Sequence, residues 1–189
     1  HIAGIIALVK HMKEIGETHR LKQVWFNFPK KEETDEYSVG EGNELTSLLL
    51  EIDGLSWNNN TSELLGSTIE FGDIKLHVLA PDHDVAYENK PKEPDELGVR
   101  SDDWYIDLRT LIDNVDDDDI DEGGTNSQSI IILAECEGKK LLLPGDSTPK
   151  KLCDALQSYN KTNGTPLELD FMKLPHHGST RNVTKNILN

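Results

Sequence analysis

The amino-acid sequence predicts a layered α/β fold in a single globular domain. Segments in which apolar residues recur every three or four positions alternate with shorter apolar runs of strand length. Helices and strands that alternate along a chain pack as layers, because each must bury its apolar face against another element. The 189 residues are enough to enclose one sizeable core. No apolar run approaches the roughly 18–20 residues that a membrane-spanning helix needs, so we expect no membrane association.

The first third of the chain predicts two helices with a short strand between them. Apolar residues at helical spacing indicate a helix over His1–Gly16. The run Val24–Phe28 predicts a strand, and the charged segment Lys30–Gly42 predicts irregular structure. Leucines on one side of Glu44–Ile52 indicate a second helix, for which Asn43 is the predicted N-cap.

The middle of the chain predicts a hairpin followed by a long connection. Ser67–Phe71 and Ile74–Leu79 are separated by a two-residue turn, and the second run alternates apolar and polar residues. His77 falls on the polar face of that strand and is predicted to be exposed. Asp82–Gly98 predicts a polar loop, and Trp104–Val115 predicts a helix.

The last third carries the clearest pattern. Ser129–Ala134 contains consecutive apolar residues, which predict a strand buried on both faces. Lys140–Leu143 predicts the next strand, and Ser147 or Thr148 can cap the helix that follows. Leu167–Leu174 predicts one more strand.

Acidic residues outnumber basic ones strongly. The chain has 19 Lys and Arg against 35 Asp and Glu, which gives a net charge of −16 and disfavours nucleic acid as a partner. Much of this charge falls within Asp116–Glu122, which we expect to be a solvated loop because burying it would strip water from many carboxylates. A calcium loop is the alternative, but Glu122 stands where that motif needs glycine. The acidic insertion Asp82–Glu122 could bind a partner protein.

Two predicted strands end in residues that can bind a metal. Asp146 directly follows Leu141–Gly145, and the pair His176 and His177 directly follows Phe171–Pro175. Side chains at the carboxyl ends of strands project from a rigid scaffold into the loops where ligands bind. Imidazole nitrogen combined with carboxylate oxygen suits zinc, manganese or iron and does not suit calcium or an iron–sulfur cluster.

The remaining histidines and the two cysteines predict no site. A pair of cysteines excludes a disulfide-dense secreted scaffold and favours reduced thiols, hence a cytoplasmic location. The other histidines are predicted to lie on exposed surface or in a loop. The residues concerned are Cys136, Cys153, His11, His19, His77 and His83.

Three sequence blocks, taken in order, resemble the metallo-β-lactamase-fold hydrolases. The start, HIAGII at residues 1–6, resembles the end of the signature H-x-[HD]-x-D-H and the residues that follow it. Residues 126–130 and 143–147 resemble the block N-x-x-S-I … L-x-G-D-S. Residues 173–179, KLPHHGS, resemble the block K-x-x-H-H-G-S. Blocks in this order are typical of the subgroup related to the hydrolase domain of the ComEC DNA-uptake channel, and the resemblance spans residues 1 to about 181.

The resemblance implies an αββα sandwich with a metal centre. His1 would ligate the second metal, and Asp146 would be the bridging carboxylate and catalytic residue. His177 would ligate the second metal, with His176 as a further ligand or as its support. We expect Zn²⁺, with Mn²⁺ or iron as alternatives, as one or two ions in the intact protein.

Asn126 and Ser129 are further candidate site residues. Asn126 lies near the position where many family members carry another metal-binding histidine. The family's first histidines precede the residue matched by His1, so the resemblance implies a fragment that lacks the N-terminal strands, the first motif and the C-terminal end. Because ligands are missing, we expect the 189-residue chain to bind metal weakly.

Two functions follow. The first is a hydrolase that uses a metal-activated hydroxide on a small-molecule, nucleotide or phosphodiester substrate. The alternative is a non-catalytic interaction or regulatory module that keeps the fold and an incomplete metal site.

Overall fold

The computed structural model describes residues 2–27, 37–82, 107, 110, 120–122, 126–179, 181–184 and 187. The chain forms two compact units, His1–Glu63 with His83–Asn89, and Leu64–Asp82 with Lys90–Asn189. His1, His83 and nearly all of the predicted helix Trp104–Val115 lie outside the described residues. Within the described part, no helix is long and apolar enough to cross a membrane.

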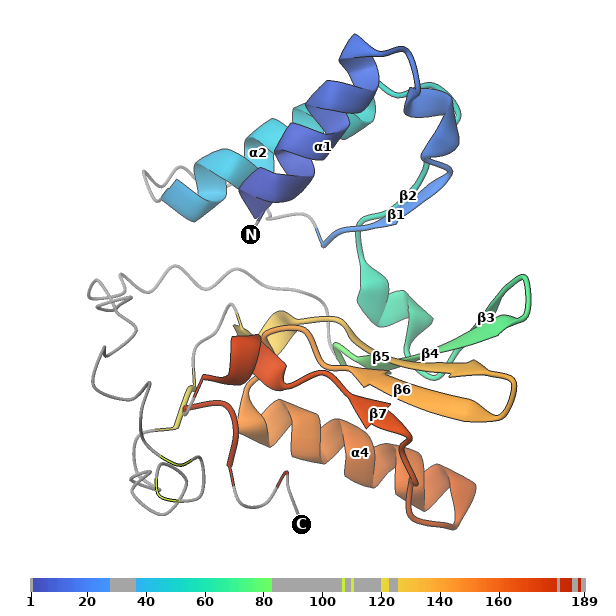
Figure 1. The fold of residues 1–189 in the computed structure, drawn as a ribbon, viewed down its shortest axis with the longest axis vertical. Coiled ribbons are helices and arrows are strands. Elements are labelled where there is room, and N and C mark those ends of the chain that lie inside the picture. Colours follow the sequence, from blue (N-terminus) through green and yellow to red (C-terminus); the bar gives the residue numbers. More distant parts are fainter. Residues whose placement is uncertain are drawn as a thin grey trace. The chain divides into compact units, whose positions relative to one another are not determined.

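The first unit is built on two helices and a two-stranded sheet. Helix α1 (Ile2–Glu14) packs against α2 (Tyr37–Leu50), and strand β1 (Gln23–Trp25) pairs in parallel with β2 (Ser56–Asn58) (Figure 1). Apolar residues from both helices and the segment after α2 form its core, because each helix turns an apolar face inward. The buried members are Ile6, Val9, Leu45, Leu49 and Ile52.

The helix α2 begins earlier than the sequence predicts. Asn43 lies inside α2, so its prediction as the N-cap is wrong, and part of the segment predicted to be irregular is helical. The Ser47 hydroxyl donates to the Asn43 carbonyl at 3.0 Å, as happens within a helix. Glycines in this segment lower helix propensity, but the packing of Leu45 and Leu49 against α1 outweighs that small preference. His11 and His19 are exposed, as predicted.

The second unit holds a five-stranded sheet in the order β3-β4-β5-β6-β7. The strands are β3 (Thr68–Phe71), β4 (Ile74–Ala80), β5 (Ile131–Cys136), β6 (Lys139–Leu143) and β7 (Phe171–Met172). Neighbouring strands run antiparallel except β6 and β7, which are parallel. The mixed α/β class predicted from the sequence is therefore present.

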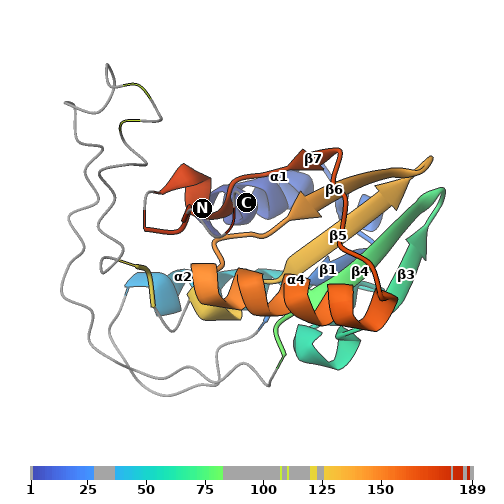
Figure 2. The same ribbon diagram turned by 90° about the horizontal axis from the view of Figure 1, so that it is seen from below.

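One helix connects the parallel pair and covers one face of the sheet. Helix α4 (Pro149–Asn163) runs from the end of β6 back toward β7, beside the strands (Figures 1 and 2). Thr148 caps it through its side chain, which accepts from the Lys151 amide at 3.4 Å, as predicted. Gly164 ends it with a left-handed backbone, φ 72°.

Two neighbouring rows of side chains, which lie on opposite faces of this sheet, differ in burial. Leu133 and Leu142 are opposite each other in the register, are fully buried, and share a cluster with Leu152 of α4. Side chains alternate along a strand, so the next row, Leu76–Ala134–Leu141–Phe171, lies on the opposite face. That row is also apolar, but Leu141 is only half-buried and Phe171 is 63% exposed.

Three sequence predictions about this sheet need correction. His77 is not on an exposed face: its side chain is 21% exposed and lies edge-on to Tyr159 of α4, because α4 covers the row that contains it. The strand predicted from Ser129 begins at Ile131, since Ser129 belongs to the preceding turn. The strand predicted over Leu167–Leu174 is reduced to β7, because the Leu167 amide donates to the Asn160 side chain and holds the preceding segment at the end of α4.

The burial contrast within β6 predicts a difference in stability. Replacing Leu142 with alanine leaves a cavity beneath α4, so we expect a loss of about 2–5 kcal/mol in the free energy of unfolding. The control Leu141→Ala removes the same atoms from the opposite face and should lose less. Urea denaturation followed by circular dichroism measures both. Equal losses would contradict the difference in burial between Leu141 and Leu142.

Candidate functional site

The first component of the candidate site is the turn after β6. Gly145 adopts φ +62°, and a Cβ there would lie 3.2 Å from the Ser129 Cβ and 3.4 Å from the Ile130 carbonyl oxygen. Glycine therefore permits both the left-handed backbone and the close approach. The Asp146 amide donates to the Ser129 hydroxyl at 3.2 Å. The turn is thus packed against Ser129. The Asp146 side chain is 36% exposed.

The second component is the turn Pro175–Gly178 after β7. His176 and His177 have φ values of 44° and 55°, and Gly178 follows with φ 83°. Non-glycine residues seldom adopt this region, and each costs on the order of 1–3 kcal/mol, which the surrounding structure must offset. The His176 amide donates to the Gly145 carbonyl at 3.0 Å, so the two turns are bonded directly.

These turns bring together two of the predicted site residues. The carboxyl ends of β6 and β7 lie at the same edge of the sheet because the strands are parallel. His177 Nε2 lies 3.6 Å from Asp146 Oδ1, with the imidazole 55% exposed. The pair stands at the surface of the unit, where solvent or a dissolved ion can reach both groups.

His176 turns to a buried polar network instead. Its Nδ1 lies 3.0 Å from Asn182 Oδ1. The Asn182 amide donates to Asp121 Oδ2 at 2.9 Å and to the Ser147 carbonyl at 3.1 Å. Asn126 donates to the same Asp121 oxygen at 2.6 Å. Asn182 is fully buried and Asp121 is 8% exposed, so the two hydrogen bonds that the Asn182 amide donates are shielded from water, whereas those of Asn126 and His176 are partly buried.

The burial of Asp121 corrects the prediction for the acidic segment. The sequence predicts a solvated loop over Asp116–Glu122, whereas Asp121 is buried and Asp116–Asp119 lie outside the described residues. Burial of this carboxylate is tolerable because two side-chain amides donate to it. Nothing in the sequence separates Asp121 from its acidic neighbours, since its donors come from Asn126 and from Asn182, which is 61 positions away.

The other predicted site residues support the turns. Asn126 holds Asp121, and Ser129 packs against Gly145 and accepts from the Asp146 amide. His1 lies outside the described residues. Among the residues that are described, no three His, Cys, Asp or Glu side chains are grouped so that they could hold a metal ion.

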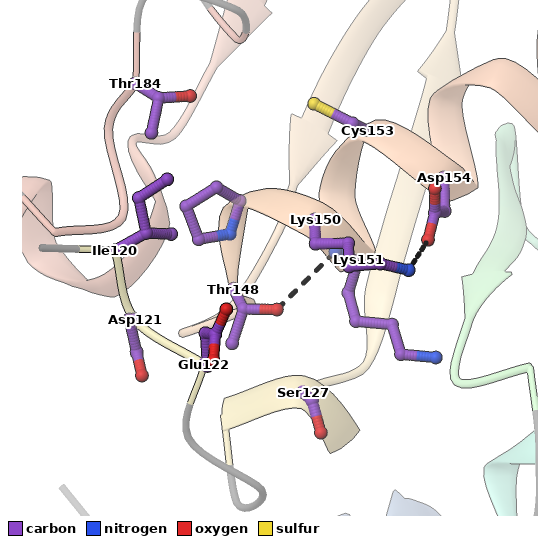
Figure 3. A pocket seen from close by; sticks show the side chains of 11 residues that line it. Ile120, Asp121, Glu122, Ser127, Thr148, Lys150, Lys151, Cys153, Asp154 and Thr184 are labelled. Carbon is purple, nitrogen blue, oxygen red and sulfur yellow. Dashed lines mark hydrogen bonds and ion pairs between the residues drawn. The ribbon is translucent and has the colours of Figure 1, made fainter. Parts of the chain in front are cut away.

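A cavity of about 740 Å³ opens beside the first turn of α4 (Figure 3). Figure 3 shows Asp121 and Glu122 on one side of it and the first turns of α4 on the other. Cys153 lines it, and burial, followed by the charge of Asp154, raises the pKa of the Cys153 thiol. Asp146 and His177 do not line this cavity, so it is adjacent to the Asp121 network and separate from the exposed pair.

This chain matches no protein-family model, no curated protein and no solved structure.

The crowding at Gly145 predicts a selective effect of substitution. Gly145→Ala combines left-handed strain with a close contact to Ser129, so it should lower stability and move Asp146. Gly72→Ala is the control: φ is +60° there, but nothing lies within 4 Å of the added Cβ. We expect the control to lose about 1–2 kcal/mol, the strain alone, and Gly145→Ala to lose more. Thermal and urea unfolding test this ranking, and equal losses would show that the turn tolerates the contact.

Proposed function

We propose that this protein is a metal-dependent hydrolase of the metallo-β-lactamase fold, related to the ComEC subgroup. The single observation that carries the proposal is the approach of His177 Nε2 to within 3.6 Å of Asp146 Oδ1. These residues come from two of the three sequence blocks on which the resemblance rests. They are 31 residues apart in the chain (177 − 146), so their proximity depends on the fold.

The sheet is consistent with the finer fold assignment. An αββα sandwich needs a sheet with a helix layer on one face and an apolar second face on which another sheet can pack. Helix α4 covers the row that contains Leu133 and Leu142. The opposite row, with Leu141 and Phe171, is apolar and incompletely buried.

The exposed pair fits part of a metal site. Two ligand atoms bonded at about 2.0–2.1 Å to one tetrahedral ion lie about 3.3 Å apart, and the observed separation of 3.6 Å is close to this. A carboxylate with an imidazole suits zinc best, with manganese or iron as alternatives. Asp146 and His177 would hold the ion, and the resemblance implies His1 and His176 as further ligands.

A bound zinc ion lowers the pKa of its water ligand to near 7, which makes hydroxide available at neutral pH. The residues of this chain contribute fixed positions: the Ser129 hydroxyl holds the Asp146 backbone, and the bond from the His176 amide to Gly145 holds both turns. The resemblance favours a phosphodiester or nucleotide substrate. The net charge of −16 repels long nucleic acid, so a small substrate is the better fit.

Zinc binding tests the metal site. We expect the 189-residue chain to bind zinc in the micromolar range or more weakly, because few ligands are grouped together. His177→Ala and Asp146→Asn should weaken this binding by at least about tenfold. His11→Ala is the matched control, since that histidine is exposed on α1. Isothermal titration measures all four proteins. Wild-type affinity in His177→Ala, or submicromolar affinity in the wild type, would contradict this account of the site.

Turnover tests the reaction class. The intact protein, supplied with Zn²⁺ or Mn²⁺, should hydrolyse a member of a panel of phosphodiesters, esters, lactones and thioesters. Asp146→Asn should abolish that hydrolysis and His11→Ala should not. If metal binds but no class is turned over, the hydrolase proposal fails and a non-catalytic metal-binding module replaces it.

A further inference from the structure

We propose that Asp121 and Asn182 are positioning residues that fix the His176 imidazole in the tautomer with its hydrogen on Nδ1. In that tautomer Nε2 carries the free lone pair, which is the atom that can bind a metal or accept a proton. The assignment of the tautomer stands on hydrogen bonding alone, whereas its consequence for metal binding rests on the proposed function.

The first step concerns the orientation of the Asn182 amide. One of its terminal atoms lies 2.9 Å from Asp121 Oδ2 and 3.1 Å from the Ser147 carbonyl oxygen. A carboxylate oxygen and a carbonyl oxygen both accept, so the atom between them must be the NH₂ group, which has two hydrogens to donate. The reverse orientation would set three oxygens against one another around a fully buried side chain, an arrangement that no water could relieve.

The second step carries this orientation to the imidazole. With NH₂ directed at Asp121 and Ser147, the Asn182 oxygen faces His176 Nδ1 at 3.0 Å. An amide oxygen only accepts, so Nδ1 must donate and therefore carries the hydrogen. A neutral imidazole has one N–H, and Nε2 is thus left with the lone pair.

The third step assigns the role of Asp121. Its Oδ2 lies 3.7 Å from His176 Nδ1, which is too long for a hydrogen bond. Asp121 therefore acts through Asn182, whose amide it orients, and Asn126 holds Asp121 in turn at 2.6 Å. Metal-bound histidines commonly donate their second N–H to a carboxylate or carbonyl that fixes the tautomer. Here the Asn182 amide oxygen accepts that N–H, and the Asp121 carboxylate is hydrogen-bonded to Asn182 in turn.

This assignment gives the two adjacent histidines different tasks. His177 meets Asp146 at the surface, whereas His176 is anchored through Nδ1 to a buried network and presents Nε2. Their ring planes are 66° apart, with centroids 6.2 Å from each other. Both residues have left-handed backbone, and their side chains lie in different surroundings.

Nuclear magnetic resonance tests the tautomer in the metal-free protein. Long-range ¹H–¹⁵N correlation spectra of histidine-labelled protein distinguish the two neutral forms, at a pH above the ordinary histidine pKa of about 6.5. His176→Gln assigns the signals. The wild type should show the Nδ1–H form for His176. A wild-type spectrum of the Nε2–H form would overturn the proposal without need of any further variant.

Substitution of Asp121 tests whether this residue fixes the tautomer of His176. In Asp121→Asn the new side chain can donate as well as accept, so only the Ser147 carbonyl still requires the Asn182 NH₂ group, and the second His176 tautomer should become detectable beside the first. Asp154→Asn is the matched control, because it makes the same chemical change at an exposed residue that lines the same cavity. A pure Nδ1–H form in folded Asp121→Asn would rule out the role assigned to Asp121. Asn182→Ser is the second variant should Asp121→Asn not fold, with the same expected mixture.

Zinc titration separates this inference from the proposed function. Asp121→Asn should weaken zinc binding by about 10–100-fold, and Asp154→Asn should not. If the wild type binds no zinc but has the expected tautomer, the metal site fails and the positioning by Asp121 stands. If zinc binds equally well to the wild type and to Asp121→Asn, and the tautomer is also unchanged, the positioning inference fails and the metal site stands.

Discussion

The parallel pairing of β6 with β7 is the constraint on which the candidate site depends. It sets the ends of two strands at one edge of the sheet, and the bond from the His176 amide to the Gly145 carbonyl then joins the turns that follow. Asp146 and His177 are 31 positions apart in the sequence (177 − 146), and without this pairing nothing would hold their turns side by side. Helix α4 makes the pairing possible, because parallel neighbours need a crossover connection and α4 supplies it.

The conformation of the site is held by the core beneath it. Left-handed backbone at His176 and His177 is unfavourable in isolation, so it persists only because its surroundings fix it. Pro175 is buried at the start of the turn, and Leu142 of β6 is buried against α4 close to the other strand end. Strained backbone supported by a well-packed sheet is a common property of ligand-binding turns, because the site then needs no ordering when the ligand arrives.

Polar groups at this edge of the sheet change character with depth. Asp146 and His177 meet at the surface, where water screens electrostatic interactions. Asp121 and Asn182 lie below, where each hydrogen bond is stronger and an unpaired group would be costly. His176 is partly exposed and contacts the buried network through Nδ1. A buried network with few alternative arrangements specifies one ring orientation and one tautomer, which an exposed histidine cannot maintain.

The sequence by itself determined the elements that carry the site. A helix cap at Ser147 or Thr148, the β3–β4 hairpin, and the strand end before Asp146 follow from local chemistry, because turns and caps depend on residues a few positions apart. Only the tertiary structure decided which face of the sheet α4 covers, which buries His77 beside Tyr159. It also decided that Asp121 is buried, since the amides that satisfy it come from Asn126 and Asn182. Long-range partners of this kind leave no periodicity in the chain, so burial of a single acidic residue cannot be deduced from its neighbours.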